Sequence, residues 1–215
     1  MAWLFAVLGY CRLRRPGSGE SEQPGPGGET AILLVRTRVV AGSAADVLDG
    51  LARVFEAAGR SGAGPALVVK REGDGCLIVT NLGRPGLASG PSFSRCRVEV
   101  RSAEPAGAEV TLSADTTALR RRALRLAVIL LGVGLAVLAG AGLLCWQVTA
   151  PGARVTGLAQ PVLFALFLSL PAPWAVYALY RRAGRSTEMF LDSAVANAAA
   201  LAGAFAAKRA KAARE

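Results

Sequence analysis

Residues 126–146 read LAVILLGVGLAVLAGAGLLCW and residues 162–180 read VLFALFLSLPAPWAVYALY, both without a single charged side chain. A helix of about 20 apolar residues covers the roughly 30 Å of hydrocarbon in a bilayer, and both stretches reach that length. The sequence therefore predicts a transmembrane helical hairpin in residues 119–185, with spans near 126–146 and 162–180.

Basic residues flank this hairpin on one side of the membrane. They precede the first span and follow the second, whereas the connecting loop, residues 147–161, contains only Arg154. Short loops rich in Lys and Arg stay in the cytoplasm. Both termini are therefore expected to be cytoplasmic, in a multi-pass protein of a bacterial inner membrane. The residues that set this topology are Arg120, Arg121, Arg122, Arg125, Arg181, Arg182 and Arg185.

The formal net charge of +10 is concentrated in the second part of the chain. Residues 1–118 carry 13 Lys and Arg against 12 Asp and Glu, whereas residues 119–215 carry 12 against 3. The basic excess lies beside the predicted spans, where anionic lipid headgroups attract it. The charge pattern therefore indicates a lipid bilayer as partner and argues against a nucleic acid.

The predicted spans contain small residues and prolines at informative positions. Gly132, Ala136 and Gly140 recur every four residues, a ridge that lets helices pack closely. The expected partner of this ridge is the second span, and a second copy of the chain is the alternative. Pro171 and Pro173 fall near the middle of the second span, where each removes a backbone hydrogen bond and predicts a kink. Neither span has an ionisable residue in its interior, which argues against a transport pathway.

Two short segments precede the first expected domain. Residues 1–15 join an apolar run to three arginines, a pattern typical of a segment at the lipid headgroups. The alternatives are a wrongly assigned start and a segment packed on the protein itself. Residues 16–29, PGSGESEQPGPGGE, are expected to form a flexible linker, because they hold too little apolar surface to become ordered.

Residues 30–118 have the composition of a small folded domain. Ser43 is a predicted helix N-cap, and apolar residues follow at helical spacing until Gly59, which is expected to end the helix at the C′ position. Alternating or β-branched stretches predict strands at 31–40, 66–70, 76–80, 94–101 and 108–114. The order β-α-β-β-β-β with short connections predicts an α+β fold, in which one helix lies on one face of an antiparallel sheet.

Two of these strands carry a clear alternation of side chains. In the first, Arg36 and Arg38 lie on the face opposite to Val35, Thr37 and Val39. In the strand at 94–101, Cys96, Val98 and Val100 are expected to point inward. The residues expected to point outward are Arg95, Arg97, Glu99 and Arg101.

Residues 186–215 predict an amphipathic, Ala-rich final helix with a basic end. Ser186 or Thr187 is its expected N-cap. Its apolar seam consists of Leu191, Val195, Ala198, Ala202 and Phe205. Packing on the soluble sheet is the ordinary outcome for such a seam, and pairing with another copy or lying on the membrane are the alternatives.

The chemistry that the sequence lacks is equally informative. The chain has no histidine, which is the commonest general base and zinc ligand. No glycine-rich turn closing in GK[ST] joins a strand to a helix. Cys11, Cys76, Cys96 and Cys145 show no CxxC or zinc spacing and are expected to be reduced thiols. No catalytic residue, cofactor or metal is therefore expected, and we do not expect an enzyme.

Three functional hypotheses remain. In the first, the cytoplasmic α+β domain is a membrane-tethered module that binds a partner protein. In the second, the domain binds a lipid or another apolar small molecule between its helix and its sheet. In the third, the hairpin builds a structural homo-oligomer.

Overall fold

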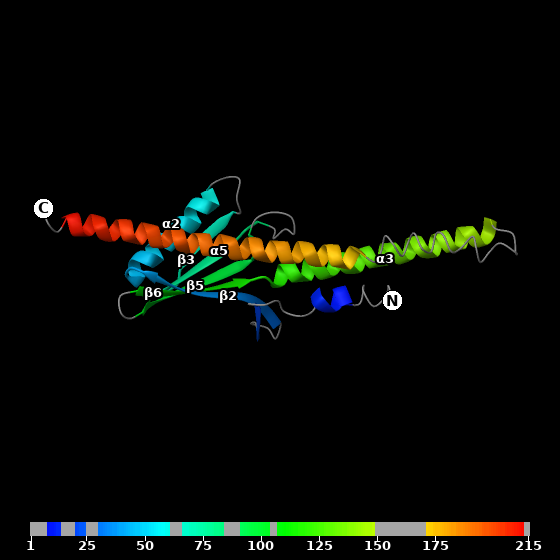
Figure 1. Cartoon of the computed structure of the whole chain (residues 1–215), viewed down its shortest axis with the longest axis horizontal. Helices are drawn as coiled ribbons and strands as arrows, with labels where there is room; N and C mark the ends of the chain where they lie inside the picture. Colours follow the sequence, from blue (N-terminus) through cyan, green and yellow to red (C-terminus); the bar gives the residue numbers. More distant parts are fainter. Residues whose placement is uncertain are drawn as a thin grey trace. The chain divides into compact units, whose positions relative to one another are not determined.

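The computed structural model describes residues 8–13, 20–24, 30–60, 66–83, 91–103, 107–148 and 171–212 (Figure 1). The chain divides into two compact units. The helical unit comprises Met1–Arg15 and Arg120–Arg181, and the sheet unit comprises Pro16–Leu119 and Arg182–Glu215. Each unit is described by itself below.

The sheet unit contains a six-stranded sheet in the order β1-β2-β6-β5-β4-β3, in which all neighbours are antiparallel. The meander expected for the last four strands is confirmed, and β2 closes on its last strand, β6. The α+β class is likewise confirmed. The bounds are β1 Glu20–Pro24, β2 Thr30–Ala41, β3 Leu67–Arg71, β4 Cys76–Asn81, β5 Arg95–Ala103 and β6 Gly107–Asp115.

Strand β1 lies in the segment that the sequence predicted to be a flexible linker. It pairs with the free edge of β2, with Glu20 opposite Leu34 and Pro24 opposite Thr30. The linker prediction considered only the burial of apolar side chains. A strand edge also offers unpaired backbone N–H and C=O groups, which a polar segment satisfies as well as an apolar one. Pro24 is tolerated because β1 is an edge strand.

Helix α2, Ala44–Arg60, begins as predicted and ends differently. The backbone N–H of Asp46 donates to Ser43 Oγ at 3.2 Å, which confirms the N-cap. Gly59, however, lies within the helix rather than at C′, and positive φ among the described glycines occurs at Gly42 and Gly73. A Cβ on Gly59 would lie 2.7 Å from the carbonyl oxygen of Leu67. Glycine is required here because α2 approaches β3 closely.

Helix α5, Pro171–Ala212, is one helix of 42 residues, so the predicted start of a separate helix at Ser186 or Thr187 is wrong. Thr187 is fully buried, and its hydroxyl donates to the carbonyl oxygen of Ala183 at 3.0 Å. A threonine can bond one turn back inside a helix as well as cap one. This hydroxyl also accepts the backbone N–H of Ser92 at 2.8 Å, which ties the chain before β5 to α5.

The core of the sheet unit lies between the sheet and a layer formed by α2 and the second part of α5 (Figure 1). Leu191, Val195, Ala198 and Ala202 of the predicted seam belong to this core, so the last part of α5 packs on the sheet. The two helices touch at Gly50, where a Cβ would lie 2.8 Å from the carbonyl oxygen of Ala198. Phe190 fills the space beside this crossing, with its ring centroid 6.0 Å from that of Phe55.

Helix α3, Thr117–Val148, supplies most of the described helical unit. Two helices of the described chain are long and apolar enough to cross a membrane, by length and composition: Thr117–Leu144 and Pro173–Arg209. Only 6% of the most apolar window in the first is buried inside the structure, against 28% in the second. The second value is higher because α5 also contributes to the core of the sheet unit.

Candidate interaction surfaces

Helices cover one face of the sheet, and no described helix covers the other, which we call the open face, although Cys76 and Ile78 of β4 are buried on it. On β5 the burial alternates as predicted, with Cys96, Val98 and Val100 buried. The residues that alternate with them point to the open face, and the side chains of Arg97 and Arg101 are 57% and 75% exposed. No described helix of the sheet unit covers these side chains.

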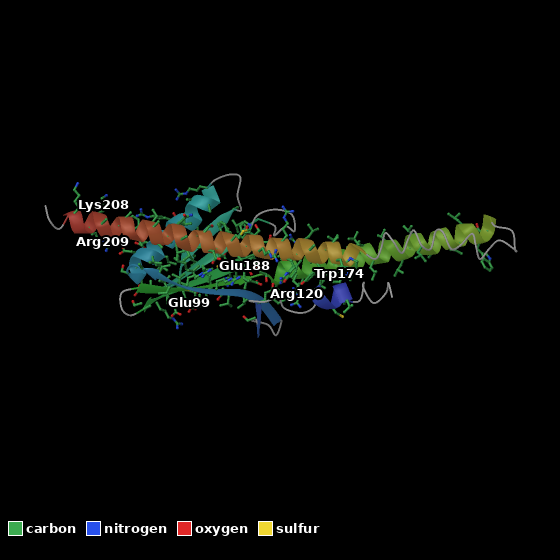
Figure 2. All side chains as sticks on the ribbon, in the orientation of Figure 1. Glu99, Arg120, Trp174, Glu188, Lys208 and Arg209 are labelled. Carbon is green, nitrogen blue, oxygen red and sulfur yellow. The ribbon has the colours of Figure 1, made fainter. Side chains whose placement is uncertain are left out.

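Glu99 forms ion pairs with two arginines on the open face (Glu99 is labelled in Figure 2). Its two carboxylate oxygens accept from Arg97 Nε at 2.9 Å and from Arg101 Nη2 at 3.1 Å. Two guanidinium groups therefore share one carboxylate. Arg95 and Lys70 lie on the same face and have no ion pair within the part of the chain that the structure describes. Glu109 of β6 lies on this face opposite Arg101, so the centre of the face has four basic side chains against the two carboxylates of Glu99 and Glu109.

Uncharged side chains extend the open face across β2. Val39 is 71% exposed, and the hydroxyl groups of Thr37 and Thr111 lie 3.4 Å apart on neighbouring strands. The face therefore combines arginines with exposed aliphatic and hydroxyl groups. Protein interfaces have a similar mixture, with arginine enriched at their centres.

The alternation of β2 places Arg36 and Arg38 on the covered side of the sheet. Arg36 Nη2 lies 2.8 Å from Glu188 Oε2, and Arg38 Nη2 lies 3.4 Å from Asp192 Oδ2 (Glu188 is labelled in Figure 2). These pairs connect the sheet edge to α5. They remain partly exposed, so each contributes about 0–1 kcal/mol to stability.

A groove of about 320 Å³ lies between α2 and the last turns of α5. Asp46 pairs with Arg209, and Asp49 pairs with Arg71 of β3. The guanidinium carbon of Arg53 lies 4.7 Å from the centroid of the Phe205 ring. The residues that line the groove are Asp46, Asp49, Arg53, Phe205, Lys208, Arg209 and Ala212.

Cys11, Cys76 and Cys96 are free thiols, and Cys96 is fully buried. Burial raises the pKa of the Cys96 thiol to about 12, against a smaller lowering by a backbone hydrogen bond from Ser113. The reactive thiolate is therefore scarce at neutral pH. Within the described ranges, no group of three His, Cys, Asp or Glu side chains is arranged to hold a metal ion.

In the helical unit, residues 8–13 form a short helical segment that packs on the protein itself. Leu13 is fully buried, and its carbonyl oxygen accepts from Arg120 Nε at 2.8 Å. Arg12 lies over the Trp174 ring, 5.5 Å from its centroid, within the range of a cation–π interaction (Arg120 and Trp174 are labelled in Figure 2). Leu8, Tyr10, Cys11 and Arg12 are exposed, so the expected place of this segment at the lipid headgroups stays a prediction beside these contacts. Arg120 was predicted only as a basic residue flanking the first span. The structure shows in addition that it is buried, with 5% of its surface exposed.

The structure describes the predicted packing residues of the hairpin on α3 and the predicted kink residues at the start of α5. Gly132, Ala136 and Gly140 are exposed on α3, and no described atom lies within 4 Å of a Cβ placed on either glycine. Residues 149–170, which include the first half of the predicted second span, lie outside the described ranges. Pro171 and Pro173 begin the described part of α5. The packing of the ridge and the kink therefore stay predictions.

Arg121, Arg122, Arg125, Arg182 and Arg185 are exposed, and Arg181 is half-buried. The topology expected from these residues stays a prediction. Comparisons of the chain with protein-family models, with curated proteins and with solved structures found no match.

Proposed function

We propose that this protein is a non-catalytic, membrane-anchored module that binds an acidic partner protein through the open face of its sheet. The observation that supports the proposal is the row Arg95, Arg97 and Arg101 on β5, exposed on a face without a covering helix among the described residues. Alternate residues of a strand are about 6.8 Å apart, so Arg95 and Arg97 are neighbours on this face, and Arg101 lies about twice that distance from Arg97, beyond Glu99. Arginine forms bidentate hydrogen bonds with carboxylates, which favours an acidic partner.

The alternative of an apolar ligand between helix and sheet has less support. The side chains at that level fill the layer: Leu51, Leu77, Val98 and Leu112 are each 0% exposed. The groove described above lies between two helices and is lined largely by charged residues. An apolar ligand would therefore find a closed core between helix and sheet, and in the groove it would leave the cations Arg53 and Lys208, unpaired among the described residues, without a partner.

Charge reversal tests the proposal. In the double variant Arg95→Glu with Arg101→Glu, we expect the partner recovered by proximity labelling or pull-down of the full chain to fall at least tenfold. Like charges would then face each other across the interface, which costs several kcal/mol. Recovery by the unchanged chain should also decrease as salt increases, because exposed charges are screened.

A matched control has the same change in net charge on another surface. Arg60 lies at the end of α2, with a side chain that is 80% exposed, and Lys211 is exposed on α5. The double variant Arg60→Glu with Lys211→Glu should recover the partner as the unchanged chain does. The proposal fails if both double variants recover equal amounts, or if the full chain recovers no partner above a control that contains only the spans.

We further place both termini in the cytoplasm of a bacterial cell, with the hairpin crossing the inner membrane. Alkaline phosphatase needs an oxidising compartment for its disulfides. Fused after Gly152 it should therefore be active, and fused after Ala114 or Glu215 it should be inactive. The support is the arginine pattern on both sides of the hairpin. Activity in the reverse pattern would overturn the topology and the cytoplasmic location of the open face.

A further inference from the structure

The groove between α2 and the end of α5 has an uneven distribution of charge. Asp46 and Asp49 are its acidic residues, and each already has an arginine partner, Arg209 and Arg71 respectively. Arg53 and Lys208 also line the groove, and neither has an ion pair within the described chain. The groove therefore offers two cationic groups without a carboxylate to neutralise them.

The aromatic ring of Phe205 holds one of these cations in place. Arg53 lies over the ring at 4.7 Å from its centroid, a cation–π arrangement. A guanidinium group held by one face keeps its N–H edges available, and these edges match the oxygens of a phosphate. Lys208 (labelled in Figure 2) lies on the same helix as Phe205, one turn further on, and adds an ammonium group.

The size and lining of the groove limit what it can bind. A volume of about 320 Å³ is at the lower end of the range for small-molecule sites, roughly 300–1,000 Å³. The exposed carbon atoms come from Phe205, Ala212 and the aliphatic stems of the basic residues. A phosphate monoester carries about 1.5 to 2 negative charges at neutral pH, which matches two cations.

We infer that this groove binds a small phosphate monoester whose organic group lies against Phe205. Arg53 binds the phosphate through its N–H edge, Lys208 neutralises the remaining charge, and Phe205 contacts the organic group. This site is separate from the open face of the sheet and does not depend on the proposed partner protein. The same chemistry occurs in a soluble phosphomonoester and in the headgroup of phosphatidic acid.

Calorimetric titration of the full chain in nanodiscs of phosphatidylcholine tests the inference. Phenyl phosphate should bind saturably and more tightly than inorganic phosphate. Lys208→Gln and Arg53→Gln should each weaken the binding of phenyl phosphate about tenfold or more, since each removes a hydrogen bond between two charged groups. Phe205→Leu should reduce the preference for phenyl phosphate over inorganic phosphate.

The matched controls are Lys70→Gln and Arg60→Gln, which remove exposed charges outside the groove. They should leave the affinity unchanged within twofold. Nanodiscs with phosphatidic acid, compared with phosphatidylglycerol, identify the source: competition with phenyl phosphate assigns the site to the lipid, and its absence assigns the site to a soluble ligand. Absence of saturable binding by phenyl phosphate, or equal affinity in the Lys208→Gln and Lys70→Gln variants, would overturn the site.

Discussion

Gly50→Val is expected to destabilise the sheet unit by about 3 kcal/mol, near the upper end of the usual cost of inserting atoms into a packed interior. A Cβ at this position would lie 2.8 Å from the carbonyl oxygen and 3.2 Å from the Cα of Ala198. Both are backbone atoms of α5, so no side chain can rotate away from the added methyl groups. The helices must separate, which loosens the contacts of buried Leu51 and Leu191.

Labelling of the Cys96 thiol measures this effect in the full chain. Cys96 is inaccessible in the folded state, so its labelling with a thiol reagent at increasing urea reports unfolding of the sheet unit. The other cysteines are replaced by serine in all samples. Gly203→Val is the matched control, because no described atom lies within 4 Å of a Cβ on this glycine of α5. Its urea midpoint should be unchanged or slightly higher. Equal midpoints for both variants would contradict the close crossing.

Leu112→Ala should have the second large effect, a loss of about 2–5 kcal/mol, which is typical for such truncations in a core. Leu112 is 0% exposed at the centre of β6, where Val98 of β5 and Arg36 of β2 are its neighbours across the strands. The truncation removes contacts with the helical layer and leaves a cavity that a sheet cannot close by moving one strand.

Val39→Ala provides the comparison in the same sheet. Val39 is 71% exposed on the open face, so its truncation should change the stability by no more than about 0.5 kcal/mol. Both variants can be measured by the labelling of Cys96 in urea. If both variants have the same midpoint, Leu112 does not lie in the core.

The sequence patterns predict the parts of the fold that depend on local periodicity. Alternation places Val98 and Val100 inside and Arg97 and Arg101 outside, because a strand with one buried face must repeat every two residues. The N-cap at Ser43 is equally local. The arginine row of the open face was therefore predictable, although its use as a docking surface is a proposal.

The remaining features depend on partners that are distant in sequence. Strand β1 can be predicted only when the free edge of β2 is known, because it forms by pairing with that edge. The close helix crossing at Gly50 can be predicted only when the position of Ala198 is known. A glycine in the middle of a helix was the available signal, because glycine there costs about 1 kcal/mol unless something requires it. The groove joins Asp46 to Arg209, 163 residues further along the chain. Local sequence patterns cannot predict a contact between residues that are so far apart in the chain.

The position of α5 in the core has a consequence for how the protein is made. Strand β6 ends at Asp115, whereas the core is complete only with Ala202. At about 5–20 residues per second, a ribosome needs roughly 4 to 17 seconds to synthesise the chain between these points. During this interval both apolar stretches leave the ribosome while the sheet still lacks part of its cover. The core of the sheet unit is therefore completed only after both apolar stretches have been synthesised.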